Sequence, residues 1–306
     1  MTFPFRRPSA CHLAAAVLTA GYVASGSPAL AGKARDYLNA PVNTWVTFYN
    51  LGHSKSVSPV LGGADFGITG IETDITSQSV ILSRIVDVAG RTGGLSVILP
   101  WADISASAGR YRAGASGIGD IGLSAEVNLF GAPALSKEEF ARWTPETFAS
   151  IHFVMTLPTG AYDPGEPVNV GSKRLSFTPT LNYSYTPDAG RTWLESYASV
   201  TLFTENNDAP GGPLDRNPLL QLEGHASRNL TDSFWLSTDM YYALGGETRQ
   251  AGAARDDGAD TLRLGAGFGI RIPHIGQLML NYDRVVARPA GQPDGQSVRL
   301  TLARLW

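Results

Sequence analysis

Residues 261–272 read Thr-Leu-Arg-Leu-Gly-Ala-Gly-Phe-Gly-Ile-Arg-Ile, with an apolar residue at every second position after Thr261. The pattern recurs in Gly119–Leu129 (GDIGLSAEVNL) and in Leu175–Tyr185 (LSFTPTLNYSY). Because successive side chains of a strand point to opposite faces, this alternation predicts strands with one apolar and one polar face. Each stretch has about ten residues or more, whereas soluble strands usually have about five or six. The fold therefore has to accommodate unusually long strands.

Weaker alternation fills most of the remaining chain, which has no convincing long amphipathic helix. We predict twelve strands, at 43–51, 77–88, 92–101, 117–130, 147–158, 173–187, 191–205, 217–230, 233–244, 259–272, 275–288 and 296–306.

The predicted connections alternate between short and long. Long, Gly-, Pro- and Asp-rich links are expected at 52–76, 102–116, 159–172, 206–216, 245–258 and 289–295, so all of them would lie at one end of the sheet. Residues 131–146 break the alternation, because a short turn is due there. This link contains Ser136 before Lys-Glu-Glu-Phe, which indicates a helical turn capped by Ser136.

Two folds could use such strands: a large soluble sandwich or barrel with an apolar interior, and an outer-membrane barrel with an apolar exterior and a polar lumen. The expected polar faces carry charges in mid-strand, such as Glu126, Glu195 and Arg263, which a packed core would not accept. The strands match the membrane thickness at a barrel tilt, and the chain ends on an aromatic residue, Trp306. We therefore predict an all-β, antiparallel up-and-down transmembrane barrel of about twelve strands. The aromatic residues near the predicted strand ends are expected at the membrane interfaces: Trp101, Phe130, Tyr185, Trp193, Phe203, Trp235, Tyr241, Tyr242, Tyr282 and Trp306.

The composition excludes several other classes of protein. Of 306 residues, 43% are hydrophobic and 17% charged, the net charge is −3 and the single cysteine is Cys11. The mean hydropathy of −0.05 is too low for several membrane-spanning helices. The slight acidic excess does not suit a nucleic-acid-binding protein, and one cysteine does not build a disulfide scaffold. The 34 glycines suit long loops and lumen-facing strand positions.

The N-terminus has the features of a cleaved secretory signal peptide. Arg6 and Arg7 precede an apolar stretch from Leu13 to Val23, and Ala29-Leu30-Ala31 forms an A-x-A cleavage site. Cleavage there would remove the cysteine and leave a net charge of −5 (22 basic against 27 acidic residues). We expect residues 1–31 to be the signal peptide, 32–42 a periplasmic N-terminal segment, and 43–306 a barrel in the outer membrane of a Gram-negative cell.

The charged and imidazole side chains on the polar faces are the candidate functional residues. The residues predicted to line the lumen are Asp120, Glu126, His152, Glu195, Glu223, His225, Asp239, Arg263, Arg271, Asp283 and Arg299. Acids on the earlier strands and bases on the later ones could set a transverse field across the pore. They could equally form a network of ion pairs that fills the barrel. Twelve strands leave a narrow bore, which a loop or the segment 32–42 could close.

Other motifs give no catalytic, metal or cofactor site. Gly117-x-Gly119-x-x-Gly122 resembles a dinucleotide fingerprint but enters a strand instead of opening a helix. The histidines of the mature chain show no metal-ligand spacing. The acidic run Asp256, Asp257 and Asp260 reads as a solvated loop, although such residues could bind Ca²⁺.

Three short stretches resemble a known bacterial family: Ala34–Pro41 (ARDYLNAP) with Thr44, Gly117–Ile121 (GIGDI) and Leu157–Gly160 (LPTG). They are similar to outer-membrane proteins named for the MetA pathway of phenol degradation, over most of the mature chain. The resemblance implies a barrel associated with the uptake of hydrophobic or aromatic compounds, and not an enzyme. Arg304 departs from the usual barrel ending, which has an apolar residue two positions before the terminal aromatic.

We predict a monomeric channel for passive or facilitated passage of small, aromatic or hydrophobic solutes. The expected partners are outer-membrane lipid and lipopolysaccharide, the solute, and the barrel-assembly machinery, with no nucleic acid and no cofactor. Two alternatives remain open. One is a barrel hydrolase or acyltransferase with Ser, His and acidic residues converging at a rim, and the other is a plugged structural or adhesive barrel.

Overall fold

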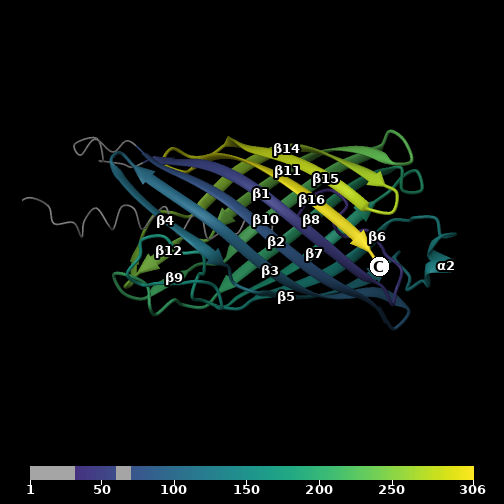
Figure 1. Cartoon of the computed structure of the whole chain (residues 1–306), viewed down its shortest axis with the longest axis horizontal. Coiled ribbons are helices and arrows are strands. Elements are labelled where there is room, and N and C mark those ends of the chain that lie inside the picture. Colours follow the sequence, from purple (N-terminus) through teal and green to yellow (C-terminus); the bar gives the residue numbers. More distant parts are fainter. Residues whose placement is uncertain (1–31, 60–69) are drawn as a thin grey trace, which may run out of the picture.

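A computed structural model describes residues 32–59 and 70–306, which form a closed antiparallel barrel of twelve strands (Figure 1). The barrel strands are β1 Trp45–Pro59, β2 Gly70–Val88, β3 Arg91–Ala108, β4 Tyr111–Ile118 continued by β5 Gly122–Phe130, β6 Phe148–Thr156, β7 Ser176–Tyr185, β8 Thr192–Phe203, β10 Leu219–Asn229, β11 Phe234–Gly245, β14 Ala259–Ile272, β15 Gly276–Ala287 and β16 Asp294–Leu305. The strands β9 Leu214–Arg216, β12 Thr248–Gln250 and β13 Ala253–Ala254 form a separate small sheet in two connections between barrel strands.

The barrel closes where the first strand meets the last. β1 pairs with β2 on one side and with β16 on the other, in a register that runs from Val46 opposite Leu305 to Val57 opposite Asp294. The backbone N–H of Trp306 also donates to the carbonyl of Trp45, at 2.9 Å. Each strand therefore has a neighbour on both sides, and the sheet presents one inner and one outer face.

The predicted all-β barrel and the number of its strands are confirmed, but the strands extend further than expected at one end. Parts of 52–76 and 102–116, expected as loops, belong to β1, β2, β3 and β4, and β3 turns into β4 through residues 109–110 alone. In these stretches the outer face is mostly polar, and the apolar residues, such as Ile75 and Ile104, lie on the inner face, so the apolar outer face of the other strand segments is absent. Ladder hydrogen bonds need only the backbone, which explains why these residues still form strands. Residues 60–69 of the expected loop lie outside the described residues, as does the expected signal peptide.

The strand expected at 117–130 is interrupted. Pairing of β3 with β4 ends at Ile118, and its pairing with β5 begins at Gly122. Between them the N–H of Gly119 donates to the carbonyl of Pro100 at 2.9 Å, which keeps the chain on β3 while Asp120 turns inward. Proline and glycine at this point weaken a regular ladder.

The two ends of the barrel differ. Among the described residues, the loop end carries the connections 109–110, 157–175, 204–218, 246–258 and 288–293, and the turn end carries 89–90, 131–147, 186–191, 230–233 and 273–275. The expected helical turn is confirmed at the turn end as α2 (Lys137–Phe140), where Ser136 and Glu139 form a capping box. Hydrogen bonds from the backbone N–H and the hydroxyl of Ser136 lower the pKa of the Glu139 carboxyl.

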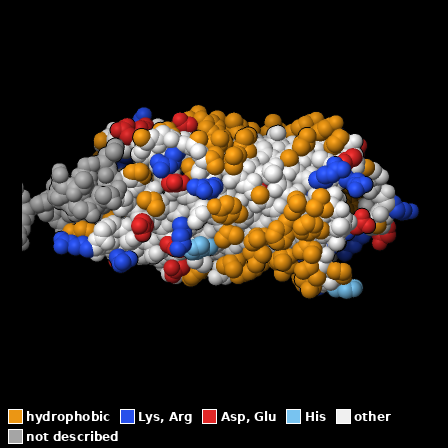
Figure 2. Space-filling view, turned by 90° about the horizontal axis from the view of Figure 1, so that it is seen from above, with side chains coloured by type: hydrophobic (Ala, Val, Ile, Leu, Met, Phe, Trp, Pro, Cys, Tyr) orange, Lys and Arg blue, Asp and Glu red, His pale blue; other side chains and the backbone are white. Residues whose placement is uncertain are grey.

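The outer face of the barrel is apolar around its girth. Outward, exposed side chains include Val80, Leu82, Val97, Leu99, Leu181, Leu194, Leu222, Leu236, Met240, Leu264 and Leu300. Figure 2 shows, on one face, hydrophobic side chains gathered over the middle of the barrel and toward the turn end, with charged side chains at both ends. Within residues 32–59 and 70–306, no helix has the length and apolar character needed to cross a membrane.

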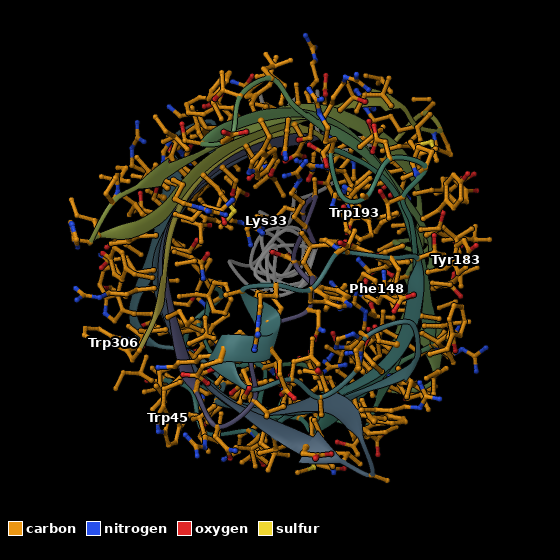
Figure 3. All side chains as sticks on the ribbon, turned by 90° about the vertical axis from the view of Figure 1, so that its right-hand side faces the viewer. Lys33, Trp45, Phe148, Tyr183, Trp193 and Trp306 are labelled. Atoms are coloured by element: carbon orange, nitrogen blue, oxygen red, sulfur yellow. The ribbon has the colours of Figure 1, made fainter. Side chains whose placement is uncertain are left out.

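Several aromatic residues expected at the membrane interfaces point inward instead. Trp193 and Trp235 are only 3% and 4% exposed, and Phe203 lines the lumen. Looking along the barrel, Trp193 and Phe148 point inward, whereas Tyr183, Trp45 and Trp306 point outward (Figure 3). The reason is strand parity, since odd-numbered residues of β8 and β11 face the lumen. The outward aromatic residues include Phe130, Tyr185, Tyr282 and Trp306.

We expect Met240→Arg to destabilise the barrel in lipid by about 2–4 kcal/mol, the cost of an outward arginine near the middle of a bilayer. Met240 is outward and 45% exposed, on the central part of β11. The matched change Gln221→Arg adds the same side chain to the lumen, where Gln221 lines the cavity, and should cost little. Denaturant-dependent folding into lipid vesicles, followed by tryptophan fluorescence, measures both. An equal loss at the two positions would contradict an apolar exterior facing lipid.

Candidate functional site: the barrel lumen

Two rows of polar side chains run across neighbouring strands of the lumen wall. In the first, Glu195, His225, Asp239, Gly265, Asp283 and Ser297 stand opposite one another from β8 to β16. In the second, Asn182, Tyr197, Glu223, Tyr241 and Arg263 do so from β7 to β14. Because direct partners on the same face have Cβ atoms about 4.5–5.5 Å apart, the second row can form a continuous chain of contacts, whereas the first is interrupted at Gly265, which has no side chain.

The structure places all of the residues predicted to line the lumen on its inner side, but it groups them differently from the prediction. Glu195, Glu223, His225 and Asp239 form one cluster on β8, β10 and β11. Glu126 pairs with His152, and Arg263 pairs with Asp283. Asp120 lies apart at the loop end, while Arg271 lines the cavity at the turn end and Arg299 lines it from β16. Their part in solute passage remains a prediction.

The cluster on β8, β10 and β11 is centred on His225. Its Nδ1 lies 2.7 Å from Asp239 Oδ1, and its Nε2 lies 3.4 Å from Glu223 Oε2. Glu195 accepts a hydrogen bond from the Tyr197 hydroxyl at 2.8 Å. All five side chains are less than a tenth exposed. Buried charges are costly unless they are paired, so the cluster requires its internal contacts.

The remaining charges also find partners nearby. Arg263 bonds to Asp283, which in turn accepts from Ser297. His152 Nδ1 lies 2.8 Å from Glu126 Oε2. Of the two predicted arrangements, these contacts favour a network of ion pairs over a transverse field between opposite walls, because the carboxylates bond to groups on their own or adjacent strands.

The N-terminal segment, defined as residues 32–41, lies inside the barrel. We expected 32–42 in the periplasm, with closure of the bore as one possibility, and the structure places the segment within the lumen near the turn end. The segment lies in the lumen because its side chains form hydrogen bonds and ring contacts with residues of the lumen wall. Its exit toward β1 is fixed by the N–H of Val42, which donates to the carbonyl of Leu135 at 2.8 Å.

Arg35 is the main polar anchor of the segment. Its backbone N–H donates to Glu195 at 2.8 Å, and its guanidinium donates to Ser227 at 2.8 Å and to Asn229 at 2.6 Å. The guanidinium also lies over the ring of Trp235, 4.8 Å from its centroid, a cation–π arrangement. Arg35 has a φ of 71°, a strained value for a non-glycine residue that these contacts hold in place.

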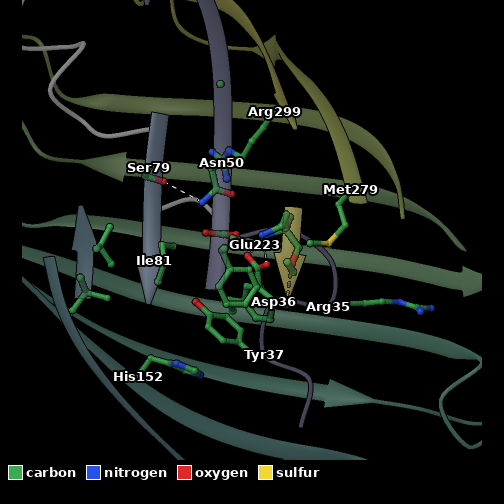
Figure 4. Close-up of a pocket in the computed structure, with 18 of the residues that line it drawn as sticks. Arg35, Asp36, Tyr37, Asn50, Ser79, Ile81, His152, Glu223, Met279 and Arg299 are labelled. Atoms are coloured by element: carbon green, nitrogen blue, oxygen red, sulfur yellow. Dashed lines mark hydrogen bonds and ion pairs between the residues drawn. The ribbon is translucent and has the colours of Figure 1, made fainter. Parts of the chain in front are cut away.

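Tyr37 is the aromatic anchor of the segment. Its ring lies 3.9 Å from that of His152 and 4.7 Å from that of Tyr197, measured between centroids. Figure 4 shows Tyr37 in the lumen close to Asp36 and Glu223. Burial, together with the surrounding carboxylates, raises the pKa of Tyr37 well above its usual value, so this hydroxyl stays protonated. Tyr37 thus contacts both β6 and β8, the strands on either side of β7.

At the loop end, the connection between β6 and β7 also turns into the barrel. The carboxylate of Asp120 accepts from the N–H of Gly160 and the N–H of Ser172, both at 2.8 Å, and so ties the β6–β7 connection to the break between β4 and β5. Added Cβ atoms at Gly160 or Gly171 would come within 2.7 Å of the other's backbone, so both positions require glycine. Val168 of this connection packs on Ile75, Ile104 and Ala106 of the inner wall.

Arg216, the last residue of β9, is a half-buried cation of the small sheet at the loop end. Its Nε donates to the carbonyl of Gly246 at 3.0 Å, and its guanidinium lies over the ring of Phe203. Burial lowers the pKa of Arg216 to about 10; the nearby Arg174 acts in the same direction and Asp257 opposes it. Arg216 therefore remains charged at neutral pH while it holds two loops together.

The predicted acidic run does not converge on a metal site. Asp257 accepts from the N–H and the hydroxyl of Thr248, both at 2.6 Å, and Asp260 accepts from the Tyr242 hydroxyl at 2.8 Å. Among the described residues, no group of three or more His, Cys, Asp or Glu side chains is arranged to hold a metal ion.

One cavity of about 1570 Å³ occupies the lumen, and residues from both ends line it: His274 and Leu305 at the turn end, Gly246 and Gln292 at the loop end. One wall is apolar, because Phe48, Ile81 and Ile98 stand directly opposite one another on β1, β2 and β3 and face inward. The facing side contributes the polar rows. The cavity therefore has an amphipathic lining.

The functional residues that the sequence reasoning missed are those of the N-terminal segment. Arg35, Asp36 and Tyr37 were noticed only for their family resemblance. Their charge and aromatic character so soon after the predicted cleavage site was the available signal, since a simple linker needs neither.

The family model described as "Putative MetA-pathway of phenol degradation" matches residues 56–299. The chain belongs to this family. The match includes every barrel strand at least in part, so the predicted resemblance is confirmed. A comparison with curated protein sequences finds no match.

Solved structures share the fold. An outer membrane channel from Pseudomonas putida F1 superposes with a TM-score of 0.76 at 18% identity, covering 90% of this chain and 100% of the other. The transport unit of the Escherichia coli autotransporter AIDA-I gives a TM-score of 0.53 at 11% identity, covering 98% of each chain. The β domain of a Bordetella autotransporter gives 0.52 at 11% identity, covering 85% of this chain and 99% of the other. At these identities the likeness shows the fold.

We expect the double variant Arg35→Ala, Tyr37→Ala to release the N-terminal segment and raise single-channel conductance in planar bilayers. The variant removes two hydrogen bonds from a charged donor, of about 1.5–3 kcal/mol each, and the ring contacts of Tyr37. The control Lys55→Ala removes an outward cation that contacts Asp74 and should leave conductance unchanged. If the double variant conducts like the wild type, the segment does not restrict the lumen.

Proposed function

We propose that the protein is an outer-membrane channel through which small aromatic and other amphipathic molecules pass down their concentration gradients. The observation that carries this proposal is the amphipathic cavity lined from both ends of the barrel. The closed ladder and apolar exterior suit a bilayer, because every backbone group within the membrane must be paired. By the usual rule for such barrels, the turn end faces the periplasm.

The apolar wall supports the choice of solute. Phe48, Ile81 and Ile98 offer a flat apolar surface, and Asn50 and Ser79 lie beside it on the same strands, joined by a hydrogen bond of 3.1 Å. A monocyclic aromatic ring bearing a hydroxyl group could place its ring on the first three residues and its hydroxyl near the other two. A uniformly polar solute would leave the apolar wall without a partner.

Uptake measurements test this function. A deletion strain and its complement are compared for uptake of a labelled monocyclic phenol at low concentration and of labelled arabinose. We expect complementation to raise phenol uptake, and the variant Ile81→Asn, Ile98→Asn to lose most of that gain while arabinose uptake is unchanged. The matched variant Ile81→Leu, Ile98→Leu keeps the wall apolar and should behave like the wild type. Equal phenol uptake with and without the protein would refute the proposal.

A hydrolase is the second candidate, because one contact set favours it. Ser150 Oγ lies 2.9 Å from His152 Nε2, and His152 Nδ1 lies 2.8 Å from Glu126 Oε2, which is the order of a nucleophile, a base and a carboxylate. Two observations weigh against it. Ser150 is only 2% exposed. It also lies on the inner wall with β6 paired on both sides, so its backbone N–H groups serve the ladder and not an oxyanion.

Labelling with a fluorophosphonate probe separates the two functions. We expect the folded wild type to remain unlabelled, since a buried serine without oxyanion donors does not react readily. An adduct on Ser150 that disappears in Ser150→Ala would establish the hydrolase instead. Heat-modified migration on gels serves as the control for folding of both proteins.

A further inference from the structure

The N-terminal segment begins against a buried carboxylate. A Cβ atom added to Gly32 would lie 2.9 Å from Glu223 Oε2 and 2.9 Å from Cε2 of Tyr197. The backbone of Gly32 is therefore in direct contact with both side chains, in the middle of the lumen. Any residue other than glycine would have to displace one of them.

Glu223 lacks a full set of partners. Its side chain is 7% exposed, and its Oε2 accepts no hydrogen bond within the part of the chain that the structure describes. The neighbouring imidazole of His225 lies 3.4 Å away through Nε2, and its Nδ1 is already held by Asp239. A buried carboxylate oxygen without a donor is costly, so the site calls for a further cation.

The nearby carboxylates have donors of their own. Glu195 accepts from the backbone N–H of Arg35 and from the Tyr197 hydroxyl. Asp36 accepts from the backbone N–H of Lys33 at 2.9 Å and pairs with its ammonium group. Glu223 is the carboxylate of this group whose Oε2 points to the start of the segment, and Figure 4 shows it beside Asp36 and Tyr37.

We propose that Glu223 binds the α-ammonium group of Gly32, which becomes the N-terminus when the signal peptide is removed after Ala31. A signal peptidase would hydrolyse the Ala31–Gly32 amide with one water molecule. Ala31 leaves with a carboxylate, and the amide nitrogen of Gly32 becomes an ammonium group. An α-amino group has an ordinary pKa of about 7.7–8.0, and pairing with a carboxylate favours its charged form.

Cleavage changes what this nitrogen can offer to Glu223. In the precursor it is a neutral amide with a single hydrogen, whereas in the mature chain it is a cation with three donors. Charge-assisted hydrogen bonds are roughly twice as strong as neutral ones. The docking of the N-terminal segment in the lumen is therefore coupled to processing of the precursor. Glu223 binds the first residue of the segment, and Arg35 and Tyr37 hold the residues that follow.

Amine acylation tests the site in the mature protein purified from outer membranes in detergent. Mass spectrometry first identifies the N-terminal residue. The folded protein is then treated with an acetylating ester at neutral pH, and peptide mass spectrometry follows the α-amine and, as internal standards, Lys55 and Lys173, which are about half exposed or more. We expect the wild-type α-amine to react at least about tenfold more slowly than in Glu223→Gln, because pairing and burial protect it.

Two further variants complete the test. Glu126→Gln removes a lumen carboxylate that pairs with His152, and it should leave the α-amine as protected as in the wild type. Gly32→Ala keeps a small residue after the cleavage site but places a Cβ against Glu223 and Tyr197, and it should expose the α-amine even if Glu223→Gln does not fold. A mature chain that begins at another residue, or equal α-amine rates in wild type, Glu223→Gln and Gly32→Ala, would overturn the proposal. The result is independent of which solute the barrel carries.

Discussion

Closure of the sheet between β1 and β16 is the constraint on which the rest of the structure depends. Once twelve strands form a ring, every barrel strand has partners on both sides and no edge is left for another chain to pair with. Closure also gives each residue one of two environments, the exterior or the lumen. The alternation of apolar and polar residues then places apolar side chains such as Leu264 and Met240 outside, and charged side chains such as Arg263 and Asp239 inside.

A polar interior creates a second requirement, because many of its charged groups, such as Glu195 and Asp239, are buried. The structure meets it by pairing Glu126 with His152, Asp239 with His225 and Arg263 with Asp283. The N-terminal segment supplies what the wall lacks, since Arg35 and Tyr37 contact groups on several strands. The same segment takes up space in the lumen, so the interactions that satisfy the interior also set how much of it remains for a solute.

Particular elements show why some features were predictable from the sequence. The strand at 259–272 was found within its observed bounds, because its outer face is apolar from Leu262 onward and its inner face is glycine or arginine from Arg263 to Arg271. The loop-end extensions of β1 to β4 were missed, since beyond the apolar band the outer face is mostly polar and the apolar residues, such as Ile75 and Ile104, lie on the inner face. Trp193 and Trp235 were assigned to the membrane interface by their place near strand ends, but which face they occupy depends on parity, which is ambiguous near an irregular turn.

By itself, the sequence determined the long strands, their number, the polar inner face and the short turns at one end, because alternation and turn chemistry are local properties. The tertiary structure alone decided the register that brings Glu195, His225 and Asp239 together, the break at Asp120, and the position of the N-terminal segment inside the barrel. These features join residues far apart in the chain, such as Gly32 and Glu223. Their energies come from burial and pairing in a lumen that exists only after the ring has closed.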